Sequence, residues 1–118
     1  NIKGKIRSLQ CRMAQARMMH KVPTATVVVK NPTHYAVALK YDPPGDASPV
    51  VVAKGMNLVA LRIIKIAEEN GVYVTENRPL ARGLYEAVEL NQPIPEQFFK
   101  PVADIIAFIY NLKKRRTA

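Results

Sequence analysis

Two short runs of strand-forming residues, with a turn between them, constrain the fold of this chain more than any other feature. Residues 26–29 are β-branched, and residues 35–39 are an apolar run. Runs of this length and composition favour strands. The Asn31-Pro32 pair between them is a common way to begin a turn. The sequence therefore predicts two strands of a hairpin with residues 30–34 at its tip.

Further strands and helices alternate along the rest of the chain. Residues 50–53 follow a Pro- and Gly-rich loop, and their uniform apolarity predicts a third, buried strand. A helix is expected after Gly55, closed by Asn70-Gly71, and residues 72–75 predict a fourth strand. The apolar positions of that helix are Leu58, Leu61, Ile64 and Ile66.

Two helices are expected after the fourth strand. Asn77 is a good N-cap for a helix that runs to about Val88, because Pro79 is tolerated in a first turn. A last helix is expected over residues 96–113, with a bend at Pro101. Its inward-facing residues are expected to be Val102, Ile105, Ile106 and Ile109.

The chain also begins with a helical pattern, since apolar residues recur at three- and four-residue steps over residues 2–20. The Val22-Pro23 pair ends that helix. In full, the order of elements predicts an α/β domain with a small mixed four-stranded sheet surrounded by about four helices. We expect residues 1–22 to form a basic helical linker and residues 23–118 to form the globular unit.

The net charge of +9 comes from the two ends of the chain. Residues 1–21 hold basic residues and no acid, and residues 113–116 are all Lys or Arg, whereas residues 22–112 hold eight Lys and Arg against nine Asp and Glu. A neutral body with basic ends suits an anionic membrane surface better than nucleic acid. Residues 102–112 are the most apolar stretch and fall short of the ~20 residues of a membrane span. We expect the chain to be a fragment of a longer, membrane-anchored protein.

Conventional cofactor and metal chemistry has little support in the sequence. Glycine-rich phosphate loops and His/Cys clusters at metal spacing are absent, so no cofactor and no metal site is predicted. Cys11 is the one cysteine, and it is interpreted as a small residue of the first helix. His20 is interpreted as structural, because a cation suits the C-terminal end of a helix. A peptidase that turns over with Cys11 or His34 would need a nucleophile, a base and an orienting group, and no such set is visible.

The reactive element that the sequence predicts is Asn31-Pro32-Thr33-His34. Asparagine usually deamidates when the next backbone nitrogen attacks its side chain, but Pro32 has no N–H and blocks that route. The opposite attack remains open, in which the Asn31 side-chain nitrogen attacks the Asn31 backbone carbonyl, closes a succinimide and expels the proline nitrogen. The sequence therefore predicts a single-turnover cut between Asn31 and Pro32, and not a turnover enzyme.

His34 and Thr33 are the expected helpers of that reaction. Imidazole both accepts and donates protons near neutral pH, so His34 can take the amide proton or protonate the leaving nitrogen. The Thr33 hydroxyl can hold the turn or bond the developing oxyanion. Alignment of the reacting groups between two strands contributes more, since it can lower the barrier by roughly 7 to 11 kcal/mol. Because both halves would stay paired in one sheet, the expected product is a nicked, folded domain.

Three segments of the chain carry a family resemblance. Residues 26–42 read TVVVKNPTHYAVALKYD, residues 51–55 read VVAKG, and residues 79–82 read PLAR. Together they resemble the cytoplasmic domain of the FlhB/YscU family, the export-switch proteins of flagellar and virulence type III secretion. The PLAR segment and the NLKK ending are more similar to the flagellar branch, with the virulence branch as the alternative.

The resemblance implies properties that the residue pattern alone does not. It implies a membrane domain upstream of Asn1, a place at the cytoplasmic face of the bacterial inner membrane, and autocleavage at Asn31 that lets the export machine change substrate class. It also implies contacts with other export-gate proteins, with secretion substrates and with a hook- or needle-length control protein. We expect Pro49, Ala103 and Ile106 to border a groove for short export signals, although apolar side chains of this kind are also ordinary core. A basic α/β domain that binds nucleic acid is the alternative from another class, in which residues 31–34 are only a turn.

Overall fold

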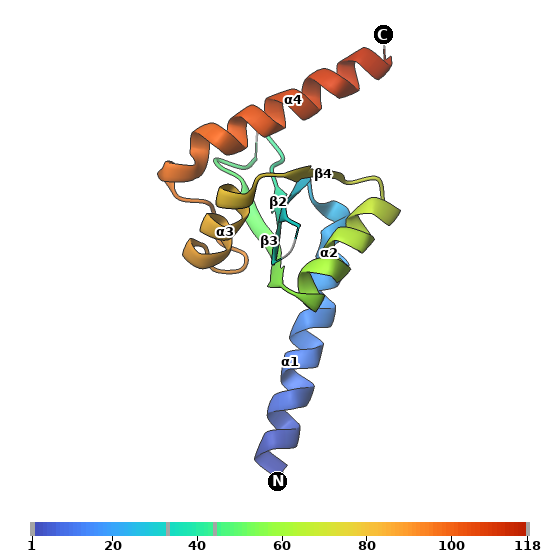
Figure 1. Cartoon of the computed structure of the whole chain (residues 1–118), viewed down its shortest axis with the longest axis vertical. Coiled ribbons are helices and arrows are strands. Elements are labelled where there is room, and N and C mark those ends of the chain that lie inside the picture. The colour runs from blue at the N-terminus through green and yellow to red at the C-terminus, as the bar shows by residue number, and fades with distance from the viewer. Residues whose placement is uncertain (1, 33, 44, 118) are drawn as a thin grey trace.

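A four-stranded mixed sheet forms the centre of the molecule and separates two layers of helices (Figure 1). The computed structural model describes residues 2–32, 34–43 and 45–117. The sheet order is β3-β2-β1-β4, in which β1 pairs antiparallel with β2, β2 antiparallel with β3, and β1 parallel with β4. The strands are β1 (Val27–Asn31), β2 (Tyr35–Lys40), β3 (Val50–Met56) and β4 (Tyr73–Glu76). The predicted α/β fold and the predicted hairpin are confirmed.

The hairpin is tighter than the sequence indicated. Strand β1 continues through Asn31, which pairs with Tyr35, the first residue of β2. Val28 pairs with Ala38 in the same register, so the β1 and β2 side chains alternate in step between the two faces of the sheet. The predicted tip of residues 30–34 therefore shrinks to the three residues between Asn31 and Tyr35.

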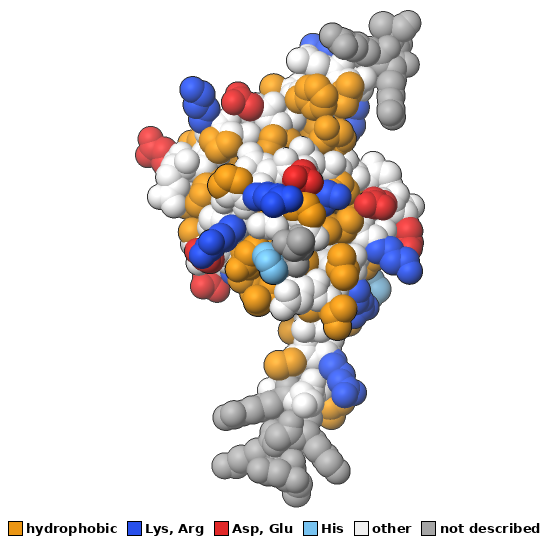
Figure 2. Space-filling view, in the orientation of Figure 1, with side chains coloured by type: hydrophobic (Ala, Val, Ile, Leu, Met, Phe, Trp, Pro, Cys, Tyr) orange, Lys and Arg blue, Asp and Glu red, His pale blue; other side chains and the backbone are white. Residues whose placement is uncertain are grey.

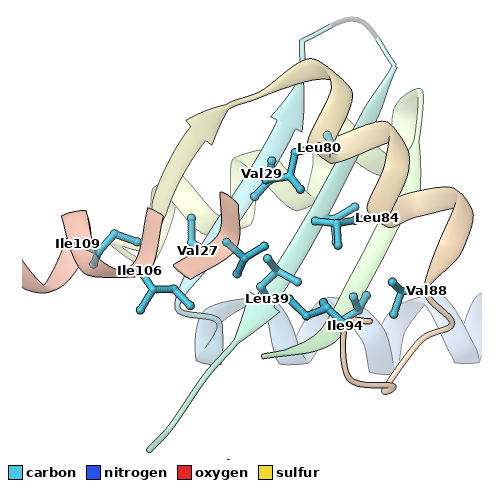
Figure 3. Close-up of a cluster of buried hydrophobic side chains, with 13 residues drawn as sticks. Val27, Val29, Leu39, Leu80, Leu84, Val88, Ile94, Ile106 and Ile109 are labelled. Atoms are coloured by element: carbon cyan, nitrogen blue, oxygen red, sulfur yellow. The ribbon is translucent and has the colours of Figure 1, made fainter. Parts of the chain in front are cut away.

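One face of the sheet is covered by α3 (Arg78–Ala87) and α4 (Phe99–Thr117) (Figure 3). Val27 and Val29 of β1 and Leu39 of β2 are fully buried against Leu84 of α3. Helix α4 adds three buried side chains, Val102, Ile106 and Ile109. Burial of each large apolar side chain contributes about 1.5–3 kcal/mol, so this layer is a main source of stability.

The other face is covered by α2 (Leu58–Glu69) and by the end of α1 (Ile2–Lys21). The buried side of α2 consists of Ala60, Ile63 and Ala67, whereas Leu58 and Leu61 are exposed. Met18 and Met19 of α1 pack into the same cluster. The boundary at residue 22 between linker and globular unit stays a prediction, and the last turn of α1 already belongs to the hydrophobic core.

Helix α1 gives the molecule its elongated shape. The chain extends 58 Å along its longest axis and about half that along the other two, because the first part of α1 projects away from the sheet (Figure 1). Lys and Arg side chains are interspersed with Asp and Glu on the face of the globular part shown in Figure 2. Within the described residues, no helix combines the length and the hydrophobicity that crossing a membrane requires.

Local signals explain where α3 and α4 begin. The Asn77 side chain accepts a hydrogen bond from the Leu80 backbone N–H at 3.2 Å, which confirms it as the N-cap of α3. Before α4, residues Glu96–Phe98 form a separate 3₁₀ turn, so Pro101 falls in the first turn of α4. The expected bend at Pro101 stays a prediction, although a first-turn proline has no helical hydrogen bond to lose.

Candidate functional site

The predicted reactive segment lies at the tip of the β1–β2 hairpin, where it forms a hydrogen-bonded β-turn. The His34 backbone N–H donates to the Asn31 carbonyl oxygen at 3.1 Å. Asparagine in the first position and proline in the second are both favoured in such turns. Asn31 and Pro32 are half-buried, and His34 is exposed. Thr33 lies outside the described residues, so the role expected for its hydroxyl stays a prediction.

The hydrogen bond on the Asn31 carbonyl bears directly on the predicted chemistry. That carbonyl belongs to the peptide bond that would break, and negative charge would develop on its oxygen as the side-chain nitrogen attacks. A backbone N–H already aimed at this oxygen is the kind of donor that stabilises an oxyanion. The sequence pattern offered the Thr33 hydroxyl for this task or for holding the turn, and the His34 N–H was missed. The Asn-Pro pair was the available signal, because a β-turn that starts there often places the fourth N–H on the first carbonyl.

Two other segments of the chain hold the turn in place. The Asn57 backbone N–H donates to the His34 carbonyl oxygen at 2.9 Å, just beyond the last β2–β3 pair. On the other side, the Asn77 backbone N–H donates to the Lys30 carbonyl oxygen at 3.1 Å. Both ends of the turn are therefore tied to neighbours in the sheet, which restricts the motion of the Asn31 carbonyl.

A cavity of about 230 Å³ borders the turn. Asn31, Pro32 and His34 line one side of it, and residues of α2 and the residue before it line the other: Asn57, Leu58, Ala60, Leu61 and Ile64. The His34 ring also makes an edge-on contact with Tyr35, with 6.1 Å between ring centroids. The exposed imidazole thus has solvent on one side and a partly apolar hollow on the other.

A second hollow brings together the three residues predicted to border a groove. Pro49, Ala103 and Ile106 line one pocket of about 350 Å³ between α4 and the loop before β3. Ile106 is also part of the core and only 6% exposed, whereas Ala103 is exposed. Sequence reasoning missed the aromatic part of this lining, which comes from Tyr41, Phe99 and Tyr110. The signal available in the sequence was Phe99, an aromatic residue shortly before the expected inward stripe of α4.

The other candidate residues lie apart from these hollows. Cys11 is exposed on α1, and His20 lies exposed in the last turn of that helix. The structural interpretation of His20 stays a prediction. Across the described ranges of the chain, no three His, Cys, Asp or Glu side chains gather as a metal site would require.

Comparison with known proteins defines the family of this chain. Residues 1–109 match the model of the FlhB HrpN YscU SpaS family. The chain is 53% identical over 114 residues to the flagellar biosynthetic protein FlhB of Bacillus subtilis, which covers 97% of the chain and 32% of that protein. The chain therefore belongs to the FlhB/YscU family, and it spans about a third of the length of the curated relatives it matches.

Solved structures agree with this assignment. The crystal structure of the cytoplasmic domain of FlhB from Shewanella putrefaciens superimposes with a TM-score of 0.81 at 43% identity, over 87% of this chain and 79% of that one. The EscU C-terminal domain with an asparagine-to-aspartate substitution superimposes with a TM-score of 0.75 at 40% identity, over 78% of this chain and 98% of that one. The predicted fold and the predicted family are both confirmed.

Proposed function

We propose that this chain is the self-cleaving cytoplasmic domain of a flagellar type III export-gate protein, and that the cut at Asn31-Pro32 controls which class of substrate is exported. One observation carries the proposal: the His34 N–H is hydrogen-bonded to the carbonyl oxygen of the bond to be cut. The high identity to flagellar FlhB proteins supports the flagellar branch.

The proposed reaction uses only groups of the turn. The Asn31 side-chain nitrogen loses a proton to His34 and attacks the Asn31 backbone carbon, while the His34 N–H stabilises the oxyanion. The tetrahedral intermediate collapses, the bond to Pro32 breaks, and the proline nitrogen takes the proton back from His34. The products are residues 1–31 with a C-terminal succinimide, which water opens, and residues 32–118 with a free proline nitrogen.

Crystal structures of variants of a relative, EscU, support the roles proposed for Asn31, Pro32 and His34, because the substituted positions have the same spacing. EscU domains have been crystallised with a substitution at an asparagine, at the proline directly after it, and at a histidine two positions after that proline. Asn31, Pro32 and His34 have the same spacing in this chain. The fold itself explains why a cut would be tolerated, because β1 stays paired with both β2 and β4.

The remaining parts of the proposal concern location and partners. We place the domain at the cytoplasmic face of the bacterial inner membrane, joined through α1 to an N-terminal membrane domain. Its proposed partners are other export-gate proteins, secretion substrates and a hook-length control protein. Short apolar export signals are proposed to bind the pocket formed by Pro49, Ala103 and Ile106, where aromatic rings supply contact area.

Intact-mass measurement tests the cleavage. The purified chain is expected to yield two masses, residues 1–31 and residues 32–118, that co-purify until they are denatured. The Asn31→Ala variant should remain whole, because it lacks the attacking nitrogen. A single unbroken mass from the unaltered chain after long incubation at neutral pH would reject the proposal.

Secretion by cells that carry an altered pocket tests the binding of export signals. Ala103→Asp puts a charge into the apolar pocket and is expected to reduce secretion of hook-class subunits. Ala16→Asp on the exposed side of α1 is the matched control and should leave secretion unchanged. Equal secretion by both variants would remove the pocket from the proposal.

A further inference from the structure

An asparagine outside the predicted reactive segment has an unusual backbone conformation and touches that segment. Asn57 connects β3 to α2 with φ 55° and ψ −121°. This region is favourable for glycine and costly for most other residues, although asparagine tolerates positive φ better than they do. Strained residues of this kind occur preferentially at functional sites.

The hydrogen bonds of Asn57 explain why the strain is located there. Its N–H donates to the His34 carbonyl oxygen at 2.9 Å, and its own carbonyl accepts from the Leu61 N–H at 3.1 Å in the first turn of α2. The chain must therefore finish its pairing with β2 and enter a helix within a single residue. A positive φ at Asn57 makes both bonds possible together.

The side chain of Asn57 does not account for its position. Asparagine at a helix N-cap commonly bonds a backbone N–H of the first turn, but the Asn57 side chain makes no such bond. Asn57 nevertheless lines the cavity beside Asn31 and His34. The backbone conformation is thus what links this residue to the turn.

We infer that Asn57 is a positioning residue for the cleavage, acting through its backbone. The His34 N–H is bonded to Asn31 and the His34 carbonyl is bonded to Asn57, so both peptide groups of His34 are fixed. Loss of the Asn57 bond would free the peptide group that contains the His34 carbonyl. The backbone at His34 could then rotate, which would move the His34 N–H away from the Asn31 carbonyl oxygen. This inference rests on the proposed self-cleavage and assigns to it a residue outside the Asn31–His34 turn.

A substitution series at position 57 tests the inference through the first-order rate of fragment formation in freshly synthesised chain. Misplacement of a reacting group by about 1 Å can cost about 100-fold in rate, so we expect Asn57→Val to cut about 100-fold more slowly and Asn57→Ala about 10-fold more slowly. Asn57→Gly adopts positive φ freely and should cut within about 3-fold of the unaltered chain. If the Asn57 side chain itself took part in catalysis, the order of the cutting rates would differ, and Asn57→Gly would cut as slowly as Asn57→Ala.

Asn91 offers a matched control, because it also has a positive φ, 66°, but lies in the loop that pairs with β3. Asn91→Ala and Asn91→Val should lower the urea midpoint as the Asn57 variants do and leave the cutting rate unchanged. Stability is measured in the uncut Asn31→Ala background. In the same background, exchange of the His34 amide should be faster with Asn57→Val than with Asn57→Gly.

The outcomes separate this inference from the proposed function. If the unaltered chain never cuts, the proposed function and the positioning role fall together. If it cuts and the four residues at position 57 give equal rates, or if Gly is as slow as Ala, only the positioning role is overturned. An equal loss of rate in the Asn91 variants would also overturn it, since general destabilisation would then explain the effect.

Discussion

Replacement of His34 by alanine should separate the two contributions that we propose this residue makes to cleavage. The backbone N–H on the Asn31 carbonyl is retained in the variant, and only the imidazole is lost. Proton transfer by a positioned side chain contributes about 10²- to 10⁴-fold in rate. With about 1.36 kcal/mol per factor of ten, the expected increase in the barrier is about 3 to 5 kcal/mol. We therefore expect slow cutting by His34→Ala, and not complete loss of cutting.

The fold should be almost unaffected by the same change. His34 is exposed and the removal of its ring leaves no hole in either hydrophobic cluster. Exposed substitutions of this kind usually change the free energy of unfolding by less than about 0.5 kcal/mol. A loss of rate without a loss of stability is thus the expected signature.

The assay follows fragment formation in chain from a pulsed cell-free synthesis, by mass spectrometry under denaturing conditions. Asn31→Ala sets the uncut baseline. His20→Ala is the matched control, because His20 is the other histidine of the chain and is exposed on α1, and it should cut at the unaltered rate. Added imidazole should restore part of the rate of His34→Ala, since the cavity beside the turn is open to small molecules. An unchanged rate in His34→Ala would refute its role in proton transfer.

Three further predictions concern the structure that holds the turn, and urea unfolding in the uncut Asn31→Ala background measures each. A Cβ at Gly55 would clash with the Val59 Cγ1 atom, so Gly55→Ala should lower the free energy of unfolding by about 1–3 kcal/mol, and no loss would show that α2 can shift. The Lys54 ammonium donates to the Tyr85 and Val88 carbonyl oxygens at 3.0 and 2.8 Å, so Lys54→Met should cost about 1.5–3 kcal/mol; a neutral result would mean that water replaces it. Asn77→Ala removes the α3 cap and should cost about 1 kcal/mol, whereas Asn77→Ser should recover most of it, and equal losses from both would contradict the capping role.

The residues of the VVAKG and PLAR segments, which carry part of the family resemblance, have different roles in the structure. In the VVAKG segment, Val51 is buried, Lys54 holds the end of α3, and Gly55 lets α2 approach closely. In the PLAR segment, Leu80 and Ala81 are buried, but Arg82 is exposed and bonds Glu86 at 3.1 Å, which raises the pKa of the Arg82 guanidinium. Each motif therefore combines residues that serve packing with one residue that makes a specific polar contact.

Much of the fold could be predicted from the sequence because the relevant forces act over a few residues. Strand formation at β1 and β2, the turn at Asn31-Pro32 and the Asn77 cap depend on local propensity and on hydrogen bonds between near neighbours. The possible chemistry of the turn was also local, since proline blocks one direction of attack whatever surrounds it. Prediction from sequence was weaker for α2, where Leu58 and Leu61 are exposed and the smaller Ala60 and Ala67 are buried.

The contacts that hold the turn were decided by tertiary structure alone. Asn57 and Asn77 lie far from His34 and Lys30 in the chain, and they meet them only because β3 and β4 lie beside the hairpin. The pocket at Pro49 and Ala103 likewise required α4 to pack across the loop before β3. Such contacts depend on how layers pack, and packing is a property of the whole core. The sequence by itself thus determined which peptide bond is predicted to break, whereas the assembled sheet decided how firmly that bond is held.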